Sequence, residues 1–272
     1  MIISVSRRTD IPRFYWDWFL KQIELGETLI SNPFNAKQKK IISLKPHDVD
    51  GFVFWTRDPQ HIAESAGLLK EKGYSFYVMV SITGYPDIFE PMAPDLERVV
   101  VGMGRLSSFI GKDRVFWRYD PIIISSLTTA EYHEQMFRYL AIRLASYVDR
   151  CIISFYDPYK KSEVRFRTLE ANEKLTRFST FSDTGYLSPE AEEAIERIAA
   201  AAHQYKIPLF SCAEPHCLER FGIKAHACVD GNLFGAVAKK DPAQRPFCRC
   251  YQSVDIGAYR TCPARCVYCY AW

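Results

Sequence analysis

The chain has 272 residues, of which 48% are hydrophobic and 25% are charged, and its net charge is +3. This length and composition suit one large globular domain or two small ones. The modest charge lacks the strong basic signature of a dedicated nucleic-acid binder, and no apolar run approaches the roughly 18 residues of a membrane span. The opening residues MIISVSRRTD do not form an export signal, so we expect a cytoplasmic protein without a membrane partner.

Short apolar or β-branched runs alternate with helical patterns along the chain. Strands are predicted at Ile2–Val5, Gly51–Trp55, Ser75–Ile82, Arg114–Arg118, Cys151–Phe155 and Ile207–Ser211. Prolines and capping residues predict helices that begin at Pro12, Pro59, Asp95, Thr129 and Ser188, and a further helix covers 163–177. Such alternation implies parallel strands with helical crossovers. We therefore predict an α/β fold, namely an incomplete TIM-type (β/α) barrel of six or seven parallel strands.

Two departures from this alternation define the domain organisation. Thr28–Ser31 and Lys40–Leu44 flank the polar stretch NPFNAKQ, which predicts a β-hairpin inserted between the first helix and the second barrel strand. From about Gly222 regular periodicity fades. We therefore divide the chain into a partial barrel, residues 1–221, and a cysteine-rich tail, residues 222–272, that packs on the barrel mouth.

Nine cysteines are unusual for a chain expected in the reducing cytosol. Their odd number argues against a disulfide framework and favours metal or cluster ligation. The final segment TCPARCVYCYAW places Cys262, Cys266 and Cys269 in a C-x-x-x-C-x-x-C pattern. Three thiolates can bind three irons of a 4Fe-4S cluster and leave the fourth iron open. A zinc site is the alternative, because zinc also binds clustered thiolates.

An open iron can bind the amino and carboxylate groups of S-adenosylmethionine. The reduced cluster can then cleave this cofactor and release a 5′-deoxyadenosyl radical, while the protein orients the cofactor and excludes water. Tyr268 precedes the last cysteine and could pack against the adenine.

The remaining cysteines predict a second metal site. Cys248 and Cys250 form a C-x-C pair, and Cys212 follows a predicted strand. The preferred ligands are Cys212, Cys228, Cys248 and Cys250, with Cys217 as the spare. Four thiolates suit either a second 4Fe-4S cluster or zinc, and the alternative for any one of them is a buried thiol. His216 and His226 are weaker candidate ligands, and Cys151 is expected to be a buried thiol inside a strand.

With these motifs the chain resembles an uncharacterised, mostly prokaryotic family that ends in a cysteine cluster similar to that of radical S-adenosylmethionine enzymes. The matching segments are SRRTDIP, NPFN, VFWTRDP, WRYDPI, SFYDPYKK, CRCYQSVDIGAY and CPARCVYCYA. The family implies no established reaction. In ordinary radical enzymes the cysteine loop follows the first barrel strand, whereas here it ends the chain. A permuted connection could still bring the loop over the barrel mouth.

Active sites of (β/α) barrels gather at the C-terminal ends of the strands. The polar residues expected there as cofactor-binding groups are Arg7, Arg8, Arg57, Ser81 and Thr83, and the candidate catalytic residues are Arg118, Asp120 and Asp157. The arginines would converge on a carboxylate-bearing cofactor, or equally on a phosphate or an acidic substrate. The structural alternatives are an internal Arg118–Asp120 ion pair and helix capping by Asp10 and Asp58.

The leading hypothesis is an iron–sulfur enzyme that binds S-adenosylmethionine and starts radical chemistry on an unknown substrate. This substrate would be a small molecule or a nucleotide-containing compound, and nucleic acid is a candidate that the charge does not support. An electron donor such as a flavodoxin or ferredoxin would be needed. The alternatives are a non-catalytic or redox iron–sulfur protein and a zinc-stabilised binding module.

Overall fold

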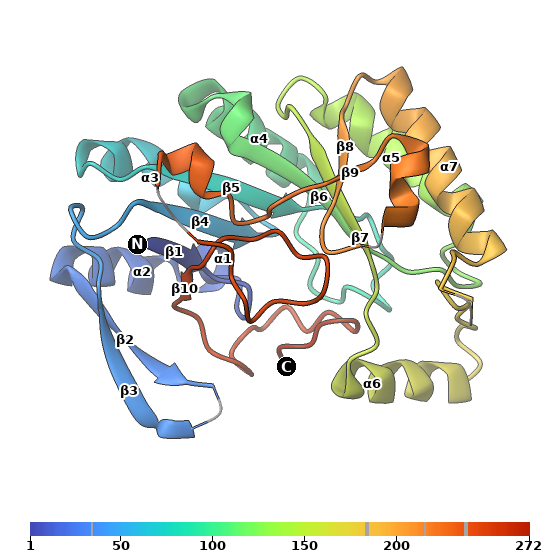
Figure 1. The fold of residues 1–272 in the computed structure, drawn as a ribbon, viewed down its shortest axis with the longest axis horizontal. Coiled ribbons are helices and arrows are strands. Elements are labelled where there is room, and N and C mark those ends of the chain that lie inside the picture. The colour runs from blue at the N-terminus through green and yellow to red at the C-terminus, as the bar shows by residue number, and fades with distance from the viewer. Residues whose placement is uncertain (34, 183–184, 215, 237–238) are drawn as a thin grey trace.

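The computed structural model describes residues 1–33, 35–182, 185–214, 216–236 and 239–272. One sheet of eight strands runs through the molecule in the spatial order β10-β1-β4-β5-β6-β7-β8-β9, and every neighbouring pair is parallel (Figure 1). The strands are β1 (Ile2–Val5), β4 (Gly51–Thr56), β5 (Phe76–Ser81), β6 (Val115–Ile122), β7 (Cys151–Phe155), β8 (Leu209–Ser211), β9 (Lys224–Ala225) and β10 (Val254–Asp255). Within the described residues, β9 and β10 do not pair with each other, so the sheet is open.

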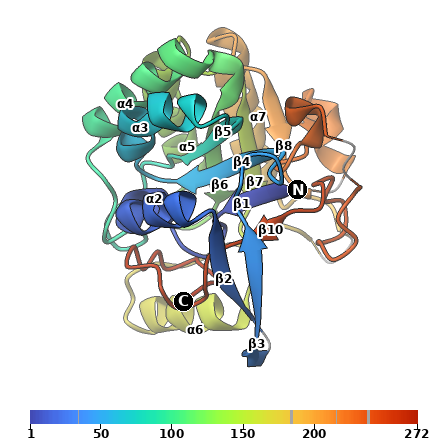
Figure 2. The same ribbon diagram turned by 90° about the vertical axis from the view of Figure 1, so that its left-hand side faces the viewer.

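Helices cover one face of this sheet. The helices are α1 (Ile11–Phe14), α2 (Trp16–Leu25), α3 (Gln60–Glu71), α4 (Leu96–Ile110), α5 (Ala130–Leu144), α6 (Lys160–Ala171) and α7 (Pro189–Gln204). Buried residues of α2, α3, α4, α5 and α7 share one core with the strands. The α6 helix stands apart from them, beside the C-terminus (Figure 2). None of the described helices is long and apolar enough to cross a membrane.

Side chains of the strands β1, β4, β5, β6, β7 and β8 alternate between two cores, as the pleat of a β-strand requires. In β4, Phe52 and Phe54 join the helix-covered core, whereas Val53 and Trp55 face the opposite side. The core on that opposite side is completed by buried or partly buried residues between positions 228 and 251 of the tail. The cysteine-rich tail therefore covers the face of the sheet that the helices leave free.

The predicted α/β fold with parallel strands is confirmed. The sheet has eight strands rather than six or seven, because β9 and β10 are two residues each and give no periodic signal. The predicted hairpin is confirmed as β2 (Glu27–Asn32) and β3 (Asn35–Ser43), which pair antiparallel. It projects away from the sheet (Figure 1).

Two predicted helices have different bounds in the structure. The single helix expected from Pro12 to about Leu25 is wrong, because the backbone leaves the helical region at Tyr15 (φ −138°, ψ 31°) between α1 and α2. The Tyr15 hydroxyl donates to the carbonyl of Thr261, 2.6 Å away in the tail, a tertiary contact that helix periodicity cannot reveal. The helix predicted at 163–177 starts earlier and ends at Ala171.

A buried histidine in α5 gives a prediction about acid stability. His133 is fully buried, with ring nitrogens 2.8 Å from the Tyr119 hydroxyl and 3.0 Å from the Ile123 carbonyl. Burial lowers its pKa from 6.5 to about 4. Between these values the unfolded chain binds more protons, so stability falls as the pH falls. We expect this histidine to cost about 2 kcal/mol of stability between pH 7 and pH 5.

Urea unfolding of the wild type and of His133→Gln at both pH values measures this contribution. Glutamine can donate and accept in the same place but does not titrate in this range. The variant should lose less stability on acidification. Equal losses in the two proteins would contradict a neutral buried His133.

Candidate functional site

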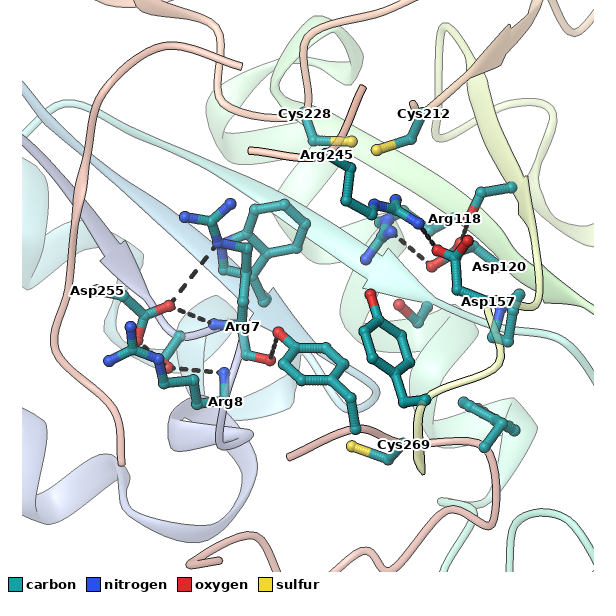
Figure 3. A pocket seen from close by; sticks show the side chains of 18 of the residues that line it. Arg7, Arg8, Arg118, Asp120, Asp157, Cys212, Cys228, Arg245, Asp255 and Cys269 are labelled. Atoms are coloured by element: carbon teal, nitrogen blue, oxygen red, sulfur yellow. Dashed lines mark hydrogen bonds and ion pairs between the residues drawn. The ribbon is translucent and has the colours of Figure 1, made fainter. Parts of the chain in front are cut away.

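A cavity of about 690 Å³ opens at the C-terminal ends of the parallel strands. Its lining includes polar residues that end or follow β1, β4, β5, β6 and β7. It also includes seven cysteines: Cys212, Cys228, Cys248, Cys250, Cys262, Cys266 and Cys269. In Figure 3, Cys212 and Cys228 lie at one side of this space and Cys269 at the opposite side, with charged side chains between them. Both cysteine sets expected from the sequence thus border the same cavity.

The terminal loop reaches the cavity because β10 extends the sheet beside β1. The two strands are parallel, with Ile3 opposite Val254 and Ser4 opposite Asp255, so the chain leaves β10 at the edge where the other strands end. The Asp255 carboxylate accepts hydrogen bonds from the hydroxyls of Ser4 (3.1 Å) and Ser6 (2.5 Å) and from the backbone of Arg7 (2.9 Å). This buried carboxylate fastens the tail to the first strand.

The three terminal cysteines are partly buried. Burial raises the pKa of all three thiols, that of Cys266 to about 12. Backbone N–H groups offset this effect: those of Asp10 and Ala264 hydrogen-bond to Cys262, and that of Ala271 lies 3.3 Å from the Cys269 sulfur. Such donors also stabilise sulfur ligands of a cluster. The loop therefore supplies the thiols, and the loop together with Asp10 at the start of α1 supplies backbone N–H groups that suit their ligating form.

The chemistry of the donors must be weighed against their spacing. No three cysteine, histidine or acidic side chains in the described parts of the chain converge as ligands of a single metal ion. A cubane cluster places a different iron on each thiolate, so its ligands need not converge on one point. The three thiols around one cavity therefore suit a cluster better than a single ion.

An arginine that the sequence analysis missed holds the terminal loop in place. Arg165 of α6 donates from Nε to the Val267 carbonyl (2.8 Å), from Nη1 to the Trp272 carbonyl (3.0 Å), and from Nη2 to the Cys269 carbonyl. Its guanidinium carbon lies 4.2 Å from the centre of the Trp272 ring. One side chain thus binds three carbonyls of the loop. The sequence did not reveal this role, because Arg165 lies more than 100 residues before the groups that it binds.

A buried network surrounds Tyr268. Arg57 donates to the Tyr268 hydroxyl (2.8 Å) and to Thr83 (3.2 Å), and it forms an ion pair with Glu90. Tyr268 and Thr83 in turn donate to Glu90, at 2.6 and 2.5 Å. Although burial opposes it, Glu90, followed by Tyr268 and Cys266, raises the pKa of Arg57. Three of the predicted cofactor-binding residues, Arg57, Thr83 and Tyr268, are therefore held by Glu90, which the sequence did not single out.

The four cysteines preferred for a second site lie in one core. All are buried in the core formed by Trp55, Tyr77 and Phe116. Hydrogen bonds to Cys212 and Cys250 raise the pKa of Cys228 well above its ordinary value, and a bond to Cys250 raises that of Cys248. The Cys250 sulfur accepts hydrogen bonds from Cys228, from Cys248 and from the Val229 N–H (3.3 Å), and these bonds lower its pKa. The Cys217 side chain lies outside the described residues.

Most of the remaining predicted residues also lie at the cavity. Arg118 forms an ion pair with Asp120 (2.5 Å), the structural alternative weighed from the sequence. Figure 3 shows Asp157 beside Arg245 of the tail, with which it forms an ion pair. Four further residues of the lining are Arg7, Arg8, Ser81 and Asp10. Asp10 caps α1, as foreseen, by accepting from the Arg13 N–H. Neither Thr83 nor His226 lines the cavity.

Several buried donors at the cavity have no acceptor in the described protein. They are the Nε atoms of Arg57 and Arg118 and the indole Nε1 of Trp55. Each belongs to a residue that lines the cavity. A buried N–H without a partner costs about 1–3 kcal/mol. A bound group with acceptor atoms, such as cluster sulfides or a cofactor carboxylate, would satisfy these donors, so the site fits such a group.

Comparison with known proteins gives a single family. No curated protein matches the chain. A family described as "Domain of unknown function (DUF1848)" matches residues 2–271, nearly the whole chain. The chain belongs to this family of unknown function.

Proposed function

We propose that the chain is an iron–sulfur enzyme that binds S-adenosylmethionine at an open-site 4Fe-4S cluster on Cys262, Cys266 and Cys269. One observation carries this proposal: β10 lies parallel beside β1, and the loop that follows it borders the cavity at the strand ends. Counted in spatial order, β10 is the first strand of the sheet. The loop then follows the first strand, as in radical enzymes, through a permuted connection. The open sheet would accordingly be an incomplete (β/α) barrel.

The residues around the cavity suit this role. When bound, the reduced cluster would supply the electron that cleaves the cofactor to a 5′-deoxyadenosyl radical. Arg57 contacts the terminal loop through its hydrogen bond to Tyr268, and its Nε has no acceptor among the described residues, so this N–H could donate to a bound cofactor. Tyr268 is fixed through its hydroxyl rather than free to follow an adenine, so its contribution would be to position the loop. Backbone donors to Cys262 and Cys269 would stabilise the ligating thiolates.

Anaerobically reconstituted protein tests the proposal. Given a strong reductant and S-adenosylmethionine, the wild type should form 5′-deoxyadenosine, and Cys266→Ala should fall to the background of the reductant alone. Cys151→Ala is the matched control, because Cys151 is a buried thiol in β7, as predicted, and does not line the cavity. Equal product from wild type and Cys266→Ala would refute the proposal.

One observation favours a redox iron–sulfur protein without the cofactor. Arg7, Arg57 and Arg118 already face acidic partners, namely Asp255, Glu90 and Asp120. Their charges are thus largely balanced before any carboxylate arrives. Electron paramagnetic resonance separates the two functions: S-adenosylmethionine should change the spectrum of the reduced cluster if it binds the open iron, and leave it unchanged otherwise.

A further inference from the structure

We propose that a second metal centre is bound through the four thiolates of Cys212, Cys228, Cys248 and Cys250. This centre lies on the face of the sheet that the tail covers. The occupant is a tetrathiolate-bound group, either Zn²⁺ or a 4Fe-4S cluster, since both accept this ligand set. The proposal does not depend on the terminal loop, because the two sites share no cysteine.

The first support is the convergence of distant segments. Cys212 follows β8, Cys228 follows β9, and the C-x-C pair lies just before β10. The four residues are 8%, 2%, 5% and 3% exposed in the order of the chain. Each makes a hydrogen bond or close electrostatic contact with another of the set. Between positions 226 and 253 the described residues form one short 3₁₀ helix and no strand, so this segment needs a further source of order.

The second support is the positive charge beside the thiols. The guanidinium carbons of Arg118 and Arg7 lie 5.0 and 5.9 Å from the centre of the Trp55 ring, and Trp55 belongs to the same core as the four cysteines. A tetrathiolate centre carries two net negative charges. Arg7 and Arg118 are paired with Asp255 and Asp120, and their guanidinium groups would still lower the cost of placing that negative charge in this core.

The third support is the set of unpartnered donors. Trp55 is 8% exposed, and its Nε1, like the Nε of Arg118, has no acceptor in the described protein. Both residues line the cavity together with the four cysteines. Thiolate and sulfide sulfurs accept N–H hydrogen bonds, and such outer contacts orient and tune metal ligands. The backbone N–H of Val229 already makes this contact with Cys250.

The spacing of the four thiols requires one adjustment before they can share a metal centre. Since no three described ligands converge on a single point, binding must turn cysteine side chains toward the occupant. The cavity beside all four sulfurs gives them room to do so. The four thiols would therefore take up their final positions only when the metal binds.

Metal and sulfide analysis of anaerobically purified full-length protein tests the proposal. The double variant Cys248→Ser/Cys250→Ser should lose either one zinc per chain or the iron and sulfide of one cluster. It should retain whatever the terminal loop binds, and Cys151→Ala should lose neither. Zinc loss identifies an ion, and joint loss of iron and sulfide identifies a cluster. Unchanged metal and sulfide in the double variant would overturn the proposal.

A second measurement covers the case in which the double variant does not fold. The variant Cys266→Ala keeps the four cysteines and lacks one terminal ligand, so its remaining metal reports on the second site. X-ray absorption at the zinc or iron edge should show a first shell of four sulfurs. A metal-free Cys266→Ala protein would overturn the second site. Metal retained there without 5′-deoxyadenosine formation by the wild type would instead reject the proposed activity alone.

Discussion

Replacing Arg57 with methionine is expected to lower the free energy of unfolding by about 3–5 kcal/mol. The Arg57 and Glu90 side chains are 12% and 2% exposed, so the variant would leave the Glu90 carboxylate buried without its cation. Methionine keeps much of the aliphatic volume, so the loss reports on charge rather than on packing. Urea unfolding of anaerobically purified wild type and variant gives the difference.

The double variant Arg57→Met/Glu90→Gln is the control for this interpretation. Glutamine still accepts from Thr83 and Tyr268, and neither buried charge remains. Removing both members of a buried pair costs far less than removing one, so this protein should recover most of the lost stability. A single variant within about 1 kcal/mol of the wild type would contradict a buried, paired Glu90.

The regular part of the fold could be predicted because it depends on local patterns. The strands Ile2–Val5 and Cys151–Phe155 have the bounds expected from the sequence, since buried parallel strands are continuous apolar runs. Helices α4, α5 and α7 begin after Asp95, Thr129 and Ser188, whose side chains accept from the first turn as capping residues do.

What escaped prediction depends on contacts across the chain. The two-residue strand β10 is defined by its pairing with β1, more than 240 residues earlier in the sequence. Asp255, Glu90 and Arg165 look like ordinary charged residues until the fold surrounds them with partners from other elements. No periodicity or spacing carries that information.

The cysteines fall between these cases. Residue type and the C-x-C spacing grouped the second set, and the structure places its four members in one core, although Cys212 comes from the partial barrel and the other three from the tail. The arginines were read less well. They do gather at the cavity. The Arg118–Asp120 ion pair was anticipated as the structural alternative, but the acids that the fold brings to Arg7 and Arg57, namely Asp255 and Glu90, were not. Because each guanidinium group is already paired with an acid, Arg57 and Arg118 offer a ligand one N–H donor each, at Nε, rather than a whole free guanidinium group.

Replacing Arg165 with methionine is expected to weaken the cluster binding that we propose for the terminal loop about 10- to 100-fold. Among the described residues of α6, Arg165 alone makes three hydrogen bonds to this loop. The acceptors of these bonds are backbone carbonyls, so no change of side chain within the loop can replace the bonds. Without them the Cys269 end of the loop would sample many conformations, and the three thiols would pay that entropy on binding. Iron retention against a chelator, measured anaerobically, gives the change.

Two variants separate this role from general effects of charge. Arg165→Lys keeps the cation but loses the planar fork, so it should recover only part of the affinity. Arg167→Met removes an exposed arginine two residues along the same helix and should leave iron retention unchanged. If Arg167→Met released iron as fast as Arg165→Met, the net charge of α6 would explain the effect. If Arg165→Met retained iron like the wild type, the other contacts of the loop would hold its thiols in place, among them the Val267 N–H to Phe89 carbonyl hydrogen bond (2.9 Å) and the Tyr270 hydroxyl to Arg7 carbonyl hydrogen bond (2.9 Å).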